Sequence, residues 1–206
     1  MKMLAIVNRK GGVGKTTLAV NLAAILGEGI PTILVDADPQ GSAAGWLPDL
    51  DDLPVIHAPD LASLQALLAK VDSAEKGLLV IDCPPLDAQV SAAVMQSADL
   101  VLIPVIPSPL DIRAVAPLLE AIAETKAPAL VVLNHIKART TSVRMARETL
   151  KEFGVPLAKT MVVSRVTHAE AAAQRVPVTV YAPSSPAANE MYELAHEVKR
   201  RLEVQS

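Results

Sequence analysis

Residues 10–17 read KGGVGKTT and lie between an apolar run and a second run with the spacing of a helix. Glycines let the backbone fold closely around an anion, and free N–H groups at the start of a helix attract phosphate oxygens. Lys15 adds positive charge there, and the hydroxyl of Thr16 can ligate magnesium. The pattern therefore predicts a phosphate-binding loop. Its members are Gly11, Gly12, Val13, Gly14, Lys15, Thr16 and Thr17.

Lys10 distinguishes this loop from the standard phosphate-binding loop. The standard pattern has a glycine at position 9, where this chain has Arg9, and requires no second lysine at position 10. Lys10 is poorly placed to fold back onto its own nucleotide, but it can reach a nucleotide held by a facing subunit. A solvated lysine is the alternative. The chain here resembles the ParA/MinD family of deviant Walker A ATPases, in which a signature lysine of this kind crosses an ATP-sandwich dimer.

Two acidic residues end a second apolar run. Residues 33–42 read ILVDADPQGS, and strand alternation places Asp36 and Asp38 on the same side. Two like charges are costly to hold together unless a cation or a water network uses them, and a simple turn is the alternative. The resemblance implies that Asp38 polarises the attacking water and that Asp36 supports the magnesium shell; the stretch 39–46, PQGSAAGW, resembles the ParA branch. The candidate catalytic residues are Lys10, Lys15 and Asp38.

A third acid follows another apolar run in residues 78–85, LLVIDCPP. An apolar strand that ends in an acid is typical of a Walker B strand, so we expect Asp82 to hold magnesium through water. A helix cap or a turn is the alternative for a single aspartate. Pro84 and Pro85 stiffen the next segment, a reasonable place for a switch that senses the γ-phosphate. The predicted metal residues are Thr16, Asp36 and Asp82.

The nucleotide base is expected to be adenine, which makes ATP and Mg²⁺ the predicted cofactors. By resemblance, a Ras-type GTPase would show Asn-Lys-x-Asp after a late strand, whereas residues 134–137 read NHIK. The ParA/MinD resemblance implies that Asn134 contacts the adenine and that backbone near Pro183 closes the other side. A turn role for Asn134 at the strand end remains open.

Composition predicts a single domain covering residues 1–206. The chain is 51% hydrophobic, ample for a core, and only 2% aromatic. No apolar run approaches the roughly 20 residues of a membrane span, and the start lacks the order of a signal peptide, so we expect a cytoplasmic protein. The single cysteine, Cys83, forms no internal disulfide, and the four histidines show no metal-ligand spacing. Because the chain begins at its first strand, we expect no N-terminal DNA-binding extension and no operator-specific repression.

Strand-like and helix-like segments alternate from end to end. Such alternation predicts an α/β fold: a three-layer, doubly wound, mainly parallel sheet with helices on both faces, as in P-loop NTPases, with the ligand at the carboxyl ends of the strands. Pro117 should kink or restart its helix. Expected helices include 61–71, capped by Asp60, and 141–153, ended by Gly154. Expected strands are 3–8, 32–35, 78–82, 100–105, 130–134 and 160–163, with weaker candidates at 55–57 and 178–181.

Charge is unevenly distributed along the chain. Residues 1–125 carry 7 Lys or Arg against 15 Asp or Glu, whereas residues 126–206 carry 12 against 7. Basic side chains along the helix 141–153 would track DNA phosphates without reading bases, although a solvated helix face is the alternative because Glu148 and Glu152 interrupt the stripe. Small family members place DNA-contacting arginines in the stretch 165–176, where Gln174 and Arg175 replace the usual glycine. The candidate DNA residues are Arg139, Arg144, Arg147, Lys151, Arg165 and Arg175.

The combined features predict a small ParA-type ATPase that serves plasmid partition, chromosome segregation or the positioning of a protein cargo. ATP would join two monomers, the homodimer would bind nonspecific DNA at the nucleoid, and a ParB-like or other adaptor would stimulate a weak intrinsic hydrolysis. A MinD-like membrane cycle is an alternative, but the final helix carries four glutamates that anionic lipid would repel, and we expect it to dock in the core instead. A dethiobiotin-synthetase-like ligase is the other alternative.

Overall fold

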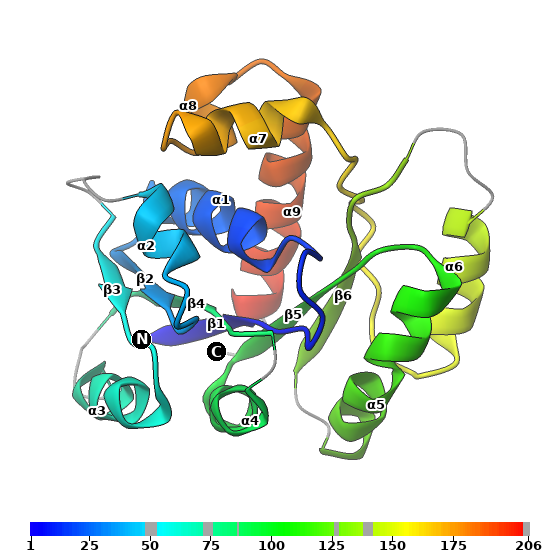
Figure 1. Cartoon of the computed structure of the whole chain (residues 1–206), viewed down its shortest axis with the longest axis horizontal. Coiled ribbons are helices and arrows are strands. Elements are labelled where there is room, and N and C mark those ends of the chain that lie inside the picture. The colour runs from blue at the N-terminus through cyan, green and yellow to red at the C-terminus, as the bar shows by residue number, and fades with distance from the viewer. Residues whose placement is uncertain (48–52, 72–75, 86, 126–127, 138–141, 204–206) are drawn as a thin grey trace.

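The computed structural model describes residues 1–47, 53–71, 76–85, 87–125, 128–137 and 142–203. Strands and helices alternate, and Figure 1 shows a central sheet with helices on both faces. The expected α/β, three-layer, doubly wound class is confirmed.

The sheet has six strands, and every pair of neighbours is parallel. Their order is β3-β2-β4-β1-β5-β6. The register pairs Ile6 with Asp82 and Asp82 with Asp36, so Asp82 lies beside the strand that leads into the glycine loop and Asp36 lies one strand further out. The strands are β1 (Lys2–Ile6), β2 (Thr32–Asp36), β3 (Val55–His57), β4 (Leu78–Asp82), β5 (Leu100–Val105) and β6 (Ala129–Leu133).

Two apolar clusters fill the spaces between the layers because alternate strand residues point to opposite faces. Leu78 and Val80 of β4 join one cluster, whereas Leu79 and Ile81 join the other. Near-continuous Leu, Ile and Val in these strands therefore reflects burial on both faces. Helices over the first cluster are α1 (Lys15–Gly27), α2 (Ser42–Trp46), α7 (Val166–Ala173), α8 (Val178–Tyr181) and α9 (Pro186–Glu203); over the second lie α3 (Leu61–Val71), α4 (Ala88–Ser97), α5 (Pro109–Thr125) and α6 (Ser142–Lys151).

The expectation of a strand at 160–163 is wrong. This stretch forms no regular ladder, and the isolated bridges nearby are Val131 with Leu157 and Ile136 with Val163. The N–H of Val162 donates to the Leu133 carbonyl of β6, but carboxylates of α9 take two others: Glu197 accepts from Thr160 at 2.6 Å, and Glu190 accepts from Val163 at 3.0 Å. Side chains of a packed helix thus replace the strand partner for these groups.

One further local expectation, the strand at 178–181, is wrong. Residues 178–181 form the short helix α8 and not a strand, because Pro177 precedes it and the side chain of Asn21 accepts the first helical N–H, from Val178, at 2.7 Å. Helix α5 continues through Pro117 without restarting. The expected cap and terminator are confirmed: Asp60 accepts the N–H of Ser63 at 2.8 Å, and Gly154 has a φ of 70° after α6.

The final helix, α9, docks in the core as expected. Met191, Leu194 and Val198 are fully buried against the first apolar cluster. Cys83 is also fully buried, and burial raises the pKa of its thiol. Among the described helices, none combines the length and the apolar character needed to cross a membrane.

Candidate nucleotide-binding site

The glycine loop joins β1 to α1 and has the conformation that its glycines permit. Gly12 and Gly14 have φ values of 74° and 90°, in the left-handed region that favours glycine. Helix α1 begins at Lys15, directly after Gly14, so the free N–H groups of its first turn face the loop. A Cβ atom on Gly14 would lie 2.2 Å from Nδ2 of Asn134, so any other residue there would displace the Asn134 side chain.

Lys15 is held inside this loop. Its ammonium donates to the carbonyl of Lys10 at 3.2 Å, and the residue is only 7% exposed. Burial lowers the pKa of Lys15, while the nearby carboxylates of Asp82 and Asp38 act in the opposite direction. A phosphate chain in the loop would give this buried charge its partner.

The buried Asp82 and the partly exposed Thr16 form a pair that fits a magnesium ion. The Thr16 hydroxyl donates to Oδ2 of Asp82 at 2.6 Å, while Oδ1 of Asp82 is buried with no hydrogen-bond partner among the described residues. Burial raises the pKa of Asp82 to about 7, and the charge of Asp36 adds to this effect. A hard cation prefers such oxygen ligands and would compensate the buried carboxylate.

No group of three or more His, Cys, Asp or Glu that could hold a metal occurs within the described ranges. A magnesium ion held by one hydroxyl, one carboxylate and the phosphates of a nucleotide needs no such group.

Asp36 shapes the loop that carries Asp38. The fully buried Asp36 accepts from the N–H of Asp38 at 3.1 Å through one oxygen, and from Ala43 and Ala44 at 2.8 and 2.9 Å through the other. It therefore caps the start of α2 and fixes the preceding turn. Both oxygens are engaged by backbone, and its predicted support of magnesium stays a prediction.

Asp38 lies at the edge of the site and is partly exposed. Its carboxylate accepts the N–H of Gln40 at 2.9 Å, and its electrostatic influence reaches both Lys15 and Asp82. A ring nitrogen of His57 contacts the Asp38 carbonyl at 3.0 Å, which ties the turn to the end of β3. The structure thus brings Asp38 together with the predicted phosphate and magnesium residues Lys15 and Asp82.

Lys10 is paired within its own chain. Its ammonium lies 2.5 Å from Oδ1 of Asp111 in the first turn of α5, with the lysine side chain 43% exposed and the aspartate 9% exposed. Ser108 donates to the other oxygen of Asp111, and Asn8 accepts the Lys10 N–H at 2.9 Å. The side chain of Lys10 is therefore directed to the start of α5, while its carbonyl accepts from Lys15.

Sequence reasoning missed Asn8, Ser108 and Asp111 as members of this site. Ser108 and Asp111 have the spacing of a capping box, S-x-x-D, with Pro109 at the first helical position, and that local signal predicts a helix start. It does not predict a lysine partner that lies 101 positions away in the sequence.

Asn134 packs under the loop at the end of β6. The residue is 3% exposed, its Nδ2 donates to the carbonyl of Val13 at 2.8 Å, and its Oδ1 accepts the N–H of His135 at 2.8 Å. Pro183 lies exposed between α8 and α9. The predicted adenine contacts of these two residues stay predictions.

Comparison with known proteins agrees with this geometry. The family model described as the CobQ/CobB/MinD/ParA nucleotide binding domain matches residues 4–178, which contain the glycine loop, Asp82 and Asn134. The chain belongs to this family. Its ParA/MinD members are P-loop ATPases, so ATPase activity is supported at the level of the family.

Relatives match over nearly the full chain. The maintenance of carboxysome distribution protein A of Halothiobacillus neapolitanus is 35% identical, over 95% of both chains. The chromosome-partitioning ATPase Soj of Thermus thermophilus is 29% identical, over 98% of this chain and 97% of Soj. The solved structure of the septum site-determining protein MinD from Pyrococcus horikoshii, in complex with Mg-ADP, matches with a TM-score of 0.82 at 20% identity, over 100% of this chain and 98% of that one.

The candidate DNA residues within the described ranges are divided between α6 and the two ends of α7. Arg144 and Lys151 are exposed on α6, and Arg144 pairs with Glu148 at 3.9 Å. Arg147, on the same helix, is half-buried and donates from Nη2 to the carbonyls of residues 158 and 159 at 3.3 Å. Figure 1 shows α6 beside α5, apart from α7.

The arginines near α7 are engaged elsewhere. Arg165 forms an ion pair with Glu190 at 2.6 Å, and Nε of Arg175 donates to the carbonyl of Gly45 at 3.2 Å. They flank opposite ends of α7, and the expectation that they extend the α6 stripe stays a prediction. Arg139 lies outside the described residues.

Proposed function

We propose that this protein is a ParA-type positioning ATPase whose ATP-bound homodimer binds DNA without sequence preference. The observation that carries the proposal is Lys10, a second lysine at the mouth of a complete phosphate-binding loop. It is partly exposed and held by Asp111, and the ammonium is not used inside its own loop. A charge kept at this edge suits contact with a nucleotide bound by a facing subunit.

The remaining site residues would each have a separate role in ATP hydrolysis. The loop and Lys15 would bind the phosphates, and Thr16 with Asp82 would hold magnesium, which neutralises charge on the phosphate oxygens when bound. Asp38, close enough to influence Lys15 and Asp82, would orient the attacking water. Lys10 from the second subunit would stabilise the charge of the transition state.

The relatives support a role in placing a large cargo. One is named for the distribution of carboxysomes and another for chromosome partitioning. We propose that this protein likewise positions a protein assembly or a DNA molecule, and that a ParB-like or other adaptor stimulates its hydrolysis. The apolar face of α9 is used in the core, which favours a DNA surface over a membrane as the track.

The test is equilibrium binding of Asp38→Ala protein to random-sequence duplex DNA, with ATP and with ADP, at two salt concentrations. Loss of Asp38 should trap ATP, so we expect binding only with ATP. Phosphate contacts should make the affinity fall steeply as salt rises. Retained ATP binding without DNA binding in either nucleotide state would contradict the DNA-based proposal, and lipid vesicles would be the next surface to test.

A further inference from the structure

Arg175, in the turn between α7 and α8, has a backbone conformation that favours glycine. Its φ is 58°, in the left-handed region that residues with a side chain seldom adopt. The turn closes the end of α7: the N–H of Arg175 donates to the carbonyl of Ala172 at 3.0 Å, and the N–H of Val176 donates to the carbonyl of Ala171 at 3.1 Å. A glycine would satisfy this turn at a lower conformational cost. An arginine at a strained position indicates a use for its side chain.

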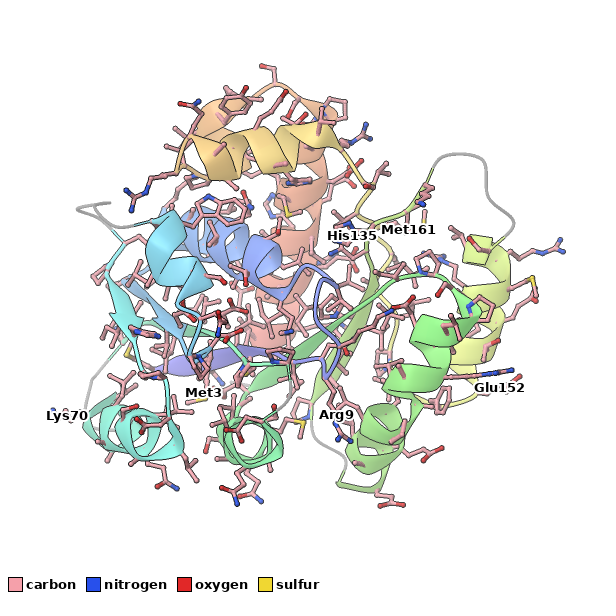
Figure 2. The ribbon with its side chains drawn as sticks, viewed as in Figure 1. Met3, Arg9, Lys70, His135, Glu152 and Met161 are labelled. Atoms are coloured by element: carbon pink, nitrogen blue, oxygen red, sulfur yellow. The ribbon has the colours of Figure 1, made fainter. Side chains whose placement is uncertain are left out.

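The side chain of Arg175 reaches α2. Its Nε donates to the carbonyl of Gly45 at 3.2 Å, across 130 positions of the sequence. The next residue of each segment makes a second bond, because the indole N–H of Trp46 donates to the carbonyl of Val176 at 3.0 Å. Figure 1 shows α2 near the end of α7 that leads to α8, and Figure 2 shows side chains in the space between α2 and α7. Two adjacent hydrogen bonds therefore connect the end of α2 to this turn.

The other end of α2 is bonded to the turn that carries Asp38. One oxygen of Asp36 accepts from two N–H groups in the first turn of α2, and its other oxygen accepts from the N–H of Asp38. The N–H of Gly41 donates to the carbonyl of Asp38 at 2.9 Å, and the N–H of Gly45 donates to the carbonyl of Gly41 at 2.8 Å. Because α2 has only 5 residues, a shift at its last residues would also move its first turn.

We propose that Arg175 and Trp46 are positioning residues for ATP hydrolysis, which hold α2 against the turn between α7 and α8 and thereby place Asp38. The inference rests on the proposed function, in which Asp38 orients the attacking water. A displacement on the order of 1 Å in such a group can slow a reaction by about a hundredfold. Arg175 and Trp46 belong neither to the phosphate loop nor to the pair of Thr16 and Asp82, so their loss leaves the binding of magnesium ATP intact.

The test measures kcat and the ATP dissociation constant of Arg175→Gly in the presence of magnesium. Glycine suits the left-handed turn, so this variant should melt no lower than the wild type. Loss of the bond to α2 should lower kcat about fivefold and leave the ATP dissociation constant unchanged. Arg175→Lys keeps a donor on a long side chain and should restore most of the rate. Arg200→Ala, which removes an exposed arginine from the last turn of α9, is the matched control and should behave as the wild type.

Trp46 offers an independent variant and a direct signal from α2. Trp46→Phe keeps an aromatic ring in the first apolar cluster but removes the indole N–H, and it should lower kcat as Arg175→Gly does. Trp46 is the single tryptophan of the chain and is 9% exposed, so its fluorescence reports on the packing of α2. In Arg175→Gly the emission should shift to longer wavelength, and acrylamide should quench it more strongly than in the wild type or in Arg175→Lys.

The outcomes separate this inference from the proposed function. An unchanged kcat in both Arg175→Gly and Trp46→Phe, or a loss of rate that is matched by a loss of ATP affinity, would overturn the inference and leave the proposed function intact. A slower Arg175→Gly with an unchanged Trp46 signal would also overturn it, because α2 would then be in place. A wild-type protein that does not hydrolyse ATP, or an Asp38→Ala protein that hydrolyses it at the wild-type rate, would overturn the proposed function itself.

Discussion

At the scale of single residues, the site contains two buried charged side chains, Asp82 and Lys15, whose charge is only partly compensated within the chain. Asp82 is 1% exposed, and one of its oxygens has no partner among the described residues. Lys15 is 7% exposed, and its ammonium donates to the carbonyl of Lys10. Burying charge in this way costs stability, and a magnesium nucleotide would relieve both costs at once.

Asp82→Asn should therefore stabilise the nucleotide-free protein while removing its magnesium-dependent affinity for ATP. The folded protein keeps this carboxyl protonated up to about pH 7, whereas an unfolded aspartate ionises near pH 4, so raising the pH through this window destabilises the wild type. The neutral amide can still accept from Thr16. We expect a gain in melting temperature of roughly 3 °C or more at pH 8, and a smaller gain at pH 5.

Glu193→Gln, which neutralises an exposed carboxylate on α9, is the control and should leave the melting temperature unchanged at both pH values. A lower melting temperature for Asp82→Asn at pH 8 would show that the buried charge is already compensated within the chain.

Lys10→Ala should bind magnesium ATP with near wild-type affinity but fail to form the ATP-dependent dimer. The Lys10 ammonium pairs with Asp111 of α5 in the monomer and not with a residue of the phosphate loop, so its loss leaves the loop intact. Light scattering after gel filtration, in an Asp38→Ala background that retains ATP, measures the dimer. Arg9→Ala removes the exposed neighbouring charge and should still dimerise. A Lys10→Ala dimer that depends on ATP would refute the role in trans.

At the scale of elements, α9 organises the segment between β6 and α7. Glu197 accepts from the backbone of Lys159 and Thr160, and Glu190 accepts from Val163 and pairs with Arg165. Burial raises the pKa of Glu197, but the hydrogen bonds from Thr160 and Lys159 lower it by a larger amount, so the pKa lies below its ordinary value. These glutamates therefore serve the fold, and their partner Arg165 has a structural role.

The structural role of Arg165 separates it from the surface cations of α6. Arg165→Ala leaves Glu190, 15% exposed, without its charged partner and should lower the free energy of unfolding by about 2 kcal/mol. Lys151→Ala, on the exposed face of α6, should change stability by less than about 0.5 kcal/mol and weaken DNA binding modestly. Urea unfolding measures the first effect. Equal stability of the two variants would contradict the structural role of Arg165.

At the scale of the whole molecule, side-chain hydrogen bonds connect α1 and α2, which follow the glycine loop and β2, to the segment that contains α8. Asn21 of α1 is fully buried and bonds to the start of α8, and Trp46 of α2 donates to the carbonyl of Val176 at 3.0 Å. Helix α1 also packs against α9. A ligand that tightens the loop before α1 should therefore stabilise the cooperative unit as a whole.

Magnesium ATP should raise the melting temperature of Asp38→Ala protein, and a chelator should remove most of that gain. Ligand at 100 times its dissociation constant adds about 2.7 kcal/mol, which corresponds to roughly 5–10 °C for a chain of this size. Differential scanning fluorimetry gives the shift. Lys15→Ala is the negative control and should show little change with ATP. A full shift in the presence of chelator would contradict the magnesium site at Thr16 and Asp82.

The sequence by itself determined the features that depend on neighbouring residues. The glycine loop, the strand-ending acids and the alternating apolar strands are local, because φ angles, helix starts and two-faced burial depend on residue type and spacing. The strand at 160–163 and the strand at 178–181 were predicted wrongly, because carboxylates of α9 and the amide of Asn21 supply the partners that decide those segments.

Tertiary structure alone decided how the charged and polar residues are used. It pairs Lys10 with Asp111 across 101 positions, engages the amide of Asn134 beneath the loop, and divides the basic residues between α6 and α7. The residue type determines which bonds a side chain can make, but the fold determines which partners lie close enough to make them. The loop could therefore be predicted from its residue types and their spacing. The side chains around it come from strands that are distant in sequence and whose carboxyl ends meet at one edge of the sheet.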